Sequence, residues 1–531
     1  MRIGGLASGI DTEHLVSQLM SAERMRLDRF SQQEQRAKWR QEAFNNINKD
    51  MANFILDSRK DLGLNRVSST GAIMQSSVES FDWVKSATSN DESIVTASAS
   101  TNALGGTHTV RVDQLADTAK VASAGGLQAN GVLDADLNFT EAGSFQIDTH
   151  NGDPVTINIA IGDSINVLTD AINNATDASG NHLGLSAAYD SSLDQLMIVT
   201  KDSGASSLIQ ITDVGGFAET RLNLGATVVG AGIAGQNAEF VFNGELVTSK
   251  ETNNFSVFGV NLNLQSISTE TVNIRVDTNT EGILDKVVAF VASYNDMIDK
   301  ITGQVNQEFN RGYLPLTNEQ KDAMSEGDIE LWQEKSKSGM LRNDENLTRM
   351  LQNVRSSLYE SVSGVSGMFD HITELGITTG NFRDGGKLII DETKLREAIN
   401  NDPEGVVDIL FKTPDSTLTG AEKTANTGII QRVYDGMIDG MKEIINQSGP
   451  GDESSLFRSV RSNMLIDFVT THGSISLIDK NITSINERVL REERILAGRE
   501  ERYWAQFTAM ERAISEMNAQ SAWLTSQLGI G

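Results

Sequence analysis

Hydrophobic residues near both ends of the chain recur at alternating spacings of three and four. A helical pattern runs from about Thr12 to Asn65, and a heptad register continues from Ile478 to Leu524. The N-terminal seam contains Ala37, Arg40, Phe44, Ile47, Met51 and Phe54. Such spacing is typical of a helix that packs along one stripe against another helix. We therefore predict two long helices that pair with each other, the first of them N-capped by Asp11.

Some seam positions of the C-terminal segment are polar. They are Glu492, Arg499, Gln506 and Gln520. Polar residues in a seam weaken an isolated two-stranded coil, but they fix its register and its choice of partner. We expect terminal helices that are stable only against partners and whose ends become ordered on assembly.

Between about residues 80 and 280, the hydrophobic period changes to that of strands. Turn signals such as Gly105-Gly106, Asn151-Gly152 and Asn243-Gly244 separate short runs of alternating apolar and polar residues. The clearest runs are Thr107–Val112, Val155–Ile159, Phe240–Phe242 and Val260–Leu264. These runs predict antiparallel strands. A single helix, from about residue 165 to residue 175, interrupts them.

Helical periodicity returns at Ile283, and further helices are predicted around residues 346–362 and 394–411. A hairpin is predicted between residues 376 and 391, because Asp384-Gly385-Gly386 favours a tight turn. The polar stretches 308–340 and 412–470 are expected to form loops or extra helices.

The order of these elements predicts an α+β multidomain protein. Terminal coiled-coil-like helices pair into a helical leg, and antiparallel β head domains are inserted between them. Several domains are expected, because 531 residues exceed what one core holds. The expected division assigns residues 1–50 and 480–531 to terminal coiled-coil legs, 51–78 and 281–479 to a helical leg domain, 79–117 and 236–280 to a β head domain, and 118–235 to a nested outer β head domain.

Composition narrows the classes of partner and compartment. The net charge of −28 argues against a nucleic-acid or anionic-membrane partner, because phosphate binding needs clustered lysine and arginine. The chain has no cysteine, which excludes disulfides, thiolate metal sites and cysteine nucleophiles. The first 20 residues do not resemble a secretory signal peptide, so export would need a dedicated route.

No catalytic, cofactor-binding or metal-binding residues are predicted. Gly230, Gly232 and Gly235 have the spacing of a dinucleotide-binding loop, but a strand pattern follows them where a helix is required. The six histidines are scattered without metal-ligand spacing. Asp148 to Asp153 lacks the terminal glutamate of a calcium loop and is interpreted as a turn.

Ordered motifs along the chain resemble those of one known family. The segment Gly5-Leu6-Ala7-Ser8-Gly9-Ile10-Asp11, with the Leu15–Met20 helix start, is similar to the beginning of flagellar filament cap proteins, also called hook-associated protein 2. Further similar segments are Gly259–Leu264 with Tyr294-Asn295, Leu375 to Phe411, and Tyr503 to Leu524. Residues 165–175 also resemble a small β-rich module shared by flagellins and hook-associated proteins.

The resemblance implies a secreted, extracellular protein at the tip of the bacterial flagellum that is not an enzyme and has no cofactor. Proteins of this family leave the cell through the flagellar type III apparatus and form a ring, which we expect to hold four to six identical subunits. The implied partners are the chain itself, flagellin, hook–filament junction proteins and an export chaperone. The β head is a candidate to bind host mucin or surface receptors. No nucleic acid or membrane partner is implied.

Candidate assembly residues come from the N-terminal motif and from the two seams. They are Leu6, Ser8, Gly9, Asp11, Leu15, Leu19, Phe44, Ile47, Ile482, Ile485, Val489, Leu496, Tyr503, Met510, Met517 and Leu524. An alternative is that the seam residues pair only within one subunit. Other functional hypotheses are a hook–filament junction or flagellin-like axial protein, a tip adhesin and, as the weakest, a secreted enzyme.

Overall fold

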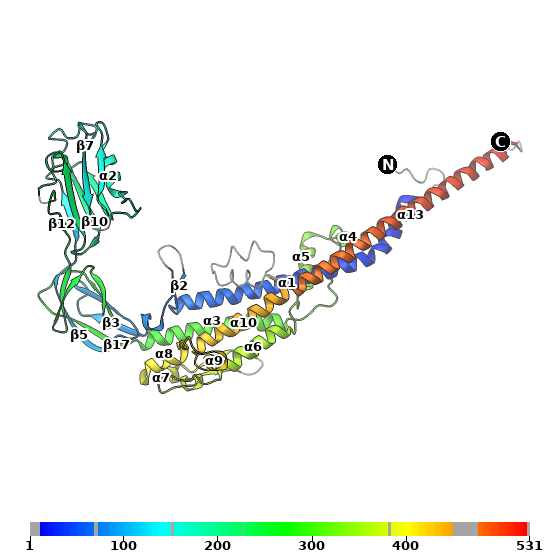
Figure 1. The fold of residues 1–531 in the computed structure, drawn as a ribbon. Coiled ribbons are helices and arrows are strands. Elements are labelled where there is room, and N and C mark those ends of the chain that lie inside the picture. Colours follow the sequence, from blue (N-terminus) through cyan, green and yellow to red (C-terminus); the bar gives the residue numbers. More distant parts are fainter. Residues whose placement is uncertain are drawn as a thin grey trace. The chain divides into compact units, whose positions relative to one another are not determined.

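The computed structural model describes residues 11–67, 73–149, 153–226, 228–380, 384–449 and 476–527. The chain forms two compact units, one built from residues up to 76 and from 284 onward, the other from residues 77–283 (Figure 1). The first unit is mainly helical, and the second is mainly β-sheet.

The helical unit contains both ends of the described chain. Its helices are α1 (Thr12–Asp61), α4 (Asn318–Asp322), α5 (Glu326–Lys337), α6 (Glu345–Leu358), α7 (Glu392–Asn401), α8 (Pro403–Phe411), α9 (Gly420–Ala425), α10 (Ile429–Ser448) and α13 (Leu477–Gln527), with most of α3 (Thr280–Asn306). It also contains the hairpins of β1 (Asn65–Val67) with β2 (Ile73–Gln75) and of β18 (Ile377–Thr379) with β19 (Leu388–Ile390), and the short helix η3 (Ile372–Leu375).

The core of the helical unit lies around α10, which packs against α6, α1 and α8. The rings of Phe54, Phe290 and Tyr434 meet there with centroids 6.0 to 6.2 Å apart. The Tyr434 hydroxyl donates to Ser58 Oγ at 2.9 Å, so its polar atom is satisfied inside the core. The second half of α1 is therefore part of this core.

Arg432, which is only 3 % exposed, ties α10 to its neighbours. Its guanidinium donates to backbone carbonyl oxygens at 2.6 to 3.1 Å. The acceptors belong to Ser357, Glu360, Ser361, Thr424, Ala425 and Thr427. Burial lowers the pKa of Arg432, and the nearby Glu360 carboxylate opposes that shift. The side chain thus supplies donors to carbonyls in the last turns of α6 and α9 and in the residues that follow these helices.

The β unit has two separate cores. The first is enclosed by a sheet of order β14-β13-β5-β17-β3 and one of order β15-β16-β4. These strands are β3 (Lys85–Ser89), β4 (Val95–Ala99), β5 (Gly106–Gln114), β13 (Ala238–Phe242), β14 (Glu245–Lys250), β15 (Asn254–Val257), β16 (Val260–Leu264) and β17 (Val272–Thr278), preceded by the short helix η1 (Val78–Ser80). Every pairing among them is antiparallel.

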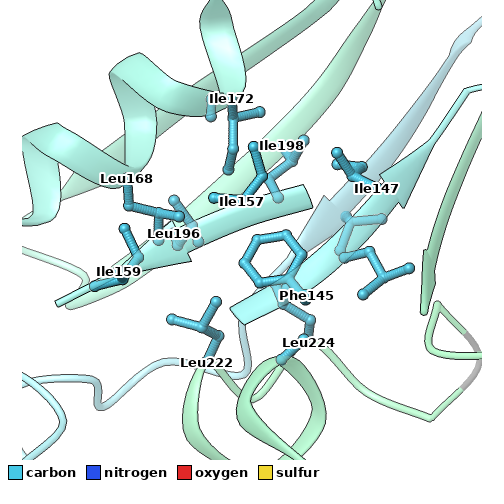
Figure 2. Packing of buried hydrophobic residues seen from close by; sticks show 14 of the residues in the cluster. Phe145, Ile147, Ile157, Ile159, Leu168, Ile172, Leu196, Ile198, Leu222 and Leu224 are labelled. Atoms are coloured by element: carbon cyan, nitrogen blue, oxygen red, sulfur yellow. The ribbon is translucent and has the colours of Figure 1, made fainter. Parts of the chain in front are cut away.

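The second core is nested between β5 and β13 in the sequence. Its sheets have the orders β6-β10-β9 and β12-β11-β7-β8. Its elements are β6 (Thr118–Ala122), β7 (Gly143–Asp148), β8 (Val155–Ile159), α2 (Ile165–Asn173), β9 (Leu185–Asp190), β10 (Gln195–Ser203), β11 (Leu208–Val214), the π-helix η2 (Phe217–Arg221) and β12 (Ile233–Ala234). Figure 2 shows Leu168 and Ile172 projecting from α2 towards strand side chains such as Ile157 and Leu196.

The α+β class, the antiparallel strands and the pairing of the terminal helices are confirmed. Asn243 and Gly244 have φ values of 51° and 88° and join β13 to β14, as the predicted hairpin turn requires. A strand, β13, follows Gly235, and a Cβ on this glycine would lie 2.5 Å from the Asp117 carbonyl oxygen. The glycine spacing therefore allows close backbone packing.

Two element predictions need correction. The single helix predicted around residues 394–411 is wrong, because α7 ends at Asn401 and Pro403 begins α8. Proline lacks an amide hydrogen and disfavours helical geometry in the residue before it, and Asp402 instead caps the new helix. The first helix ends at Asp61, short of Asn65, because Gly63 takes a φ of 78°.

The two polar stretches expected to form loops or extra helices contain helices where the structure describes them. The stretch 308–340 contains α4 and α5, and 412–449 contains α9 and α10. Asn151-Gly152 and residues 450–475 lie outside the described residues. The boundary expected between residues 50 and 51 falls inside α1.

Candidate assembly surface of the paired terminal helices

The helix α1 begins at a defined cap. Asp11 Oδ1 accepts a hydrogen bond from the His14 backbone amide at 2.9 Å, and Glu13 lies in the first turn. Both carboxylates suit the positive end of the helix dipole. The predicted role of Asp11 as N-cap is confirmed.

The helices α1 and α13 pack side by side and run antiparallel (Figure 1). Going forward along α1, the contacts move backward along α13. Arg26 Nε lies 2.9 Å from Glu492 Oε1, and Gln41 Nε2 donates to Asp479 at 2.8 Å. Nearer the start of α1, Glu23 pairs with Arg499. The polar seam positions predicted at Glu492 and Arg499 are thus satisfied by partners on α1.

Apolar contacts fill the seam between these polar pairs. Val16, Met20 and Leu496 are buried together, and Leu27, Tyr503, Trp504 and Phe507 pack partly buried against them. Nearer the start of α13, Ile478 and Ile485 are also buried. Four of the seven side chains in this cluster are only partly buried, so the pair depends on polar matching as well as on burial.

The candidate assembly residues occupy different environments. Leu6, Ser8 and Gly9 lie outside the described residues. Phe44, Ile47, Ile485 and Leu496 are buried, whereas Leu15, Ile482, Val489 and Tyr503 are half-buried. Leu19 is 41 % exposed, and exposure is also high for Met510, Met517 and Leu524.

Packing near the start of α1 uses Val16 and Met20 in place of Leu19. These two residues were not predicted from the sequence as packing residues, although the heptad spacing that indicates them is present. A seven-residue repeat through Val16, Met20, Glu23 and Leu27 has the same alternation of four and three as the repeat through Leu19. The sequence contains both repeats, and only the position of α13 decides between them.

A groove of about 620 Å³ runs beside the pair, between α1, α13 and the start of α4. Arg24 lies 3.7 Å from Glu319 at its rim. Burial raises the pKa of the Asp28 carboxyl in this groove; the Glu319 charge adds to the shift and Arg24 opposes it. The negative charges of the carboxylates in this groove are therefore only partly offset by nearby arginine.

Within the described part of the chain, no group of three or more histidine, cysteine or acidic side chains is placed to hold a metal. Among the same residues, no helix combines the length and apolar character needed to cross a bilayer. The arrangement can bind another protein surface by packing and charge.

Comparison with known proteins gives matches at both ends of the chain. Residues 8–119 match the family model described as flagellar hook-associated protein 2 N-terminus, and residues 235–519 match the corresponding C-terminus model. Flagellar hook-associated protein 2 of Halalkalibacterium halodurans is 29 % identical over 566 residues, with 99 % of each chain covered. The protein of that name from Thermotoga maritima is 24 % identical over 393 residues, which cover 70 % of this chain and 54 % of that one.

Among solved structures, the chain is similar to the crystal structure of the D1-D2-D3 domains of the flagellar cap protein FliD from Escherichia coli. The sequence identity is 21 % and the TM-score is 0.49, with 75 % of this chain and 99 % of that chain covered.

Proposed function

The chain belongs to the flagellar hook-associated protein 2 family, and we propose that it caps the flagellar filament. In this role an oligomer of the chain sits at the filament tip, promotes the folding and insertion of arriving flagellin subunits, and prevents their loss. The protein works by packing and carries out no covalent chemistry.

The single observation that carries this proposal is the match of both family models to the two ends of the chain. The chain is also similar to a relative of the same family along 99 % of its length. The helix α1 and residues 477–519 of α13 lie within the matched regions, and the two helices pair with each other, so the matched ends form one structural element.

We propose finer partners on the same basis. The exposed Met510, Met517 and Leu524 at the end of α13 are suited to contact flagellin or a neighbouring subunit, because apolar side chains in a row favour helix docking. Export by the flagellar type III route, a chaperone and hook–filament junction proteins complete the proposed set of partners. The mature location is extracellular, at the flagellum tip.

The expected domain division also stays a proposal. It assigns residues 1–50 and 480–531 to terminal legs that engage the filament, and the two β cores to head domains. The separation of the β unit into two hydrophobic cores supports distinct inner and outer head domains.

Deletion of the gene tests the cap function. Cells without the chain should keep their hooks, lack filaments and release flagellin monomers into the medium, and expression of the intact gene in trans should restore filaments. Normal filaments in the deletion strain would exclude the cap function. A strain without hooks would instead place the protein earlier in assembly.

A further inference from the structure

A second groove lies on another face of α1 and is lined by arginines. Its volume is about 700 Å³, and its walls come from α1, α13 and the segments around residues 309–311 and 339–343. The lining arginines are Arg36, Arg40, Arg311, Arg342 and Arg488, and no carboxylate is among its lining residues. For a chain with a net charge of −28, this is a local reversal of sign.

Most of this positive charge is not neutralised within the described part of the chain. Arg40 pairs with Asp344 at 3.1 Å, and Arg36 stacks over the Phe309 ring at 4.9 Å. Arg311, Arg342 and Arg488 are exposed and form no ion pair with any described residue. Grouped like charges repel one another, so a bound anionic surface would relieve this repulsion.

The groove also has apolar walls. Ile478 and Ile485 of α13 line it, together with Met340 and Phe309. Guanidinium groups around an apolar floor suit an amphipathic acidic helix, whose apolar side chain enters the groove while its carboxylates meet the arginines.

The helix α5 has this character. Glu330 and Glu334 are exposed one turn apart, and Leu331 between them is 61 % exposed. Glu326 and Asp328 add further exposed carboxylates at its start. In the part of the chain that the structure describes, Glu330 and Glu334 have no ion-pair partner.

The helix α5 cannot enter the groove of its own chain, because it is held on the other side of α1. Trp332 Nε1 donates to the Leu314 carbonyl at 2.7 Å, and Lys337 Nζ lies 3.4 Å from Glu42. On α1, Glu42 is about 200° around the helix axis from the groove-lining Arg40, at about 100° per residue. The acidic helix and the basic groove therefore face opposite directions on one subunit.

We propose that the arginine groove of one subunit receives α5 of a second copy of the chain. This inference deepens the proposed function, because it rests on self-assembly of the cap and names the surfaces that carry it. The two surfaces differ, so the contact is head-to-tail, and such contacts generate rings when the rotation closes.

Charge reversal in the full-length protein tests this contact. The groove variant is R342E/R488E, and the helix variant is E330R/E334R. A matched control, R494E/R502E, makes the same charge change at exposed positions of α13 outside the groove. Self-association is measured by sedimentation velocity over a concentration series, and circular dichroism checks that each variant is folded.

Each reversed variant alone should self-associate on the order of 100-fold more weakly than the wild type, because like charges would face each other across the contact. An equimolar mixture of the two variants should associate again, since each reversed surface then meets its complement. The control should behave like the wild type, and added salt should weaken wild-type association.

Three results would overturn the proposal: wild-type association that both reversals leave unchanged, a helix variant that associates normally while the groove variant does not, or a wild-type chain that stays monomeric throughout. Filament growth in the deletion and complementation strains is scored separately. A cap that works while its association ignores these variants would exclude this contact alone and leave the proposed function standing.

Discussion

Arg26 of α1 and Glu492 of α13 form an ion pair across the seam of the terminal helices, with Nε 2.9 Å from a carboxylate oxygen. The two side chains differ in environment, since that of Glu492 is 11 % exposed and that of Arg26 is 72 % exposed. An ion pair with one partner in water stabilises little, whereas Glu492 loses hydration in the seam. The pair therefore contributes more to register than to stability.

Replacing Glu492 with leucine should stabilise the pairing of α1 and α13 by about 1 kcal/mol, because an apolar side chain at this seam position extends the contact made by Leu496. Urea unfolding of the full-length chain, followed by circular dichroism, measures the change. Glu493→Leu at the exposed neighbouring position is the control and should have little effect. A lower stability of E492L would show that the ion pair outweighs apolar packing there.

Arg432→Met should destabilise the helical unit by about 3 kcal/mol or more, because several buried carbonyls lose their donor together. Chemical denaturation should show an earlier transition for that unit. Arg349→Met removes an exposed arginine from α6 and serves as the control. Equal stability of R432M and the wild type would mean that water replaces the guanidinium at these carbonyls.

The sequence predicts those parts of the architecture that depend on residues close together in the chain. Asp11, Asn243-Gly244 and the strand runs were predictable, because caps, tight turns and alternation depend on neighbouring residues. The contacts of Arg432 were not, since its acceptors come from chain segments that only the tertiary fold brings together.

On the candidate assembly surface, too, local features were predictable and contacts made by the tertiary fold were not. The heptad register predicted that α13 has a partner, and the polar seam positions predicted a fixed register and choice of partner. The matching side chains, Arg26 for Glu492 and Glu23 for Arg499, are seen only in the structure. The choice between Leu19 and Met20 as packing residue could not be made, since both fit a seven-residue repeat. The arginine groove could not be predicted from the sequence for a different reason. Its residues are spread from Arg36 to Arg488, and no regular spacing in the sequence relates them.

Alkaline pH should destabilise the helical unit through its buried tyrosines. Burial raises the pKa of the Tyr434 hydroxyl above the ordinary value of 10.0, while the hydrogen bond with Ser58 and the Arg59 charge oppose that shift. Because the folded-state pKa is the higher one, this stabilisation is fully present below about pH 10 and is lost as the pH rises further. Denaturation midpoints measured between about pH 8 and pH 11 should fall at the upper end.

Tyr434→Phe separates the hydrogen bond from the ionisation. At neutral pH it should cost about 1 kcal/mol, because Ser58 loses its donor. Above about pH 10 the decline of stability should be shallower than in the wild type, since one buried ionisable group is gone. Tyr359→Phe, at a site 42 % exposed, is the control. An unchanged alkaline decline in Y434F would assign it to other groups.

Removal of residues 1–40 and 480–531 should leave a folded, soluble core. The part of α1 that remains carries Phe44, Ile47 and Met51, which are buried within the helical unit. The part removed contributes mainly the seam with α13, so neither partner of that seam is left exposed. Circular dichroism and a cooperative thermal transition would establish the folded state.

A longer deletion, of residues 1–55 and 480–531, also removes Phe44, Ile47, Met51 and Phe54 and should unfold the helical unit, since it empties the core around α10. If the shorter deletion already unfolds the protein, the terminal helices belong to the core, and legs that order only on assembly would be excluded.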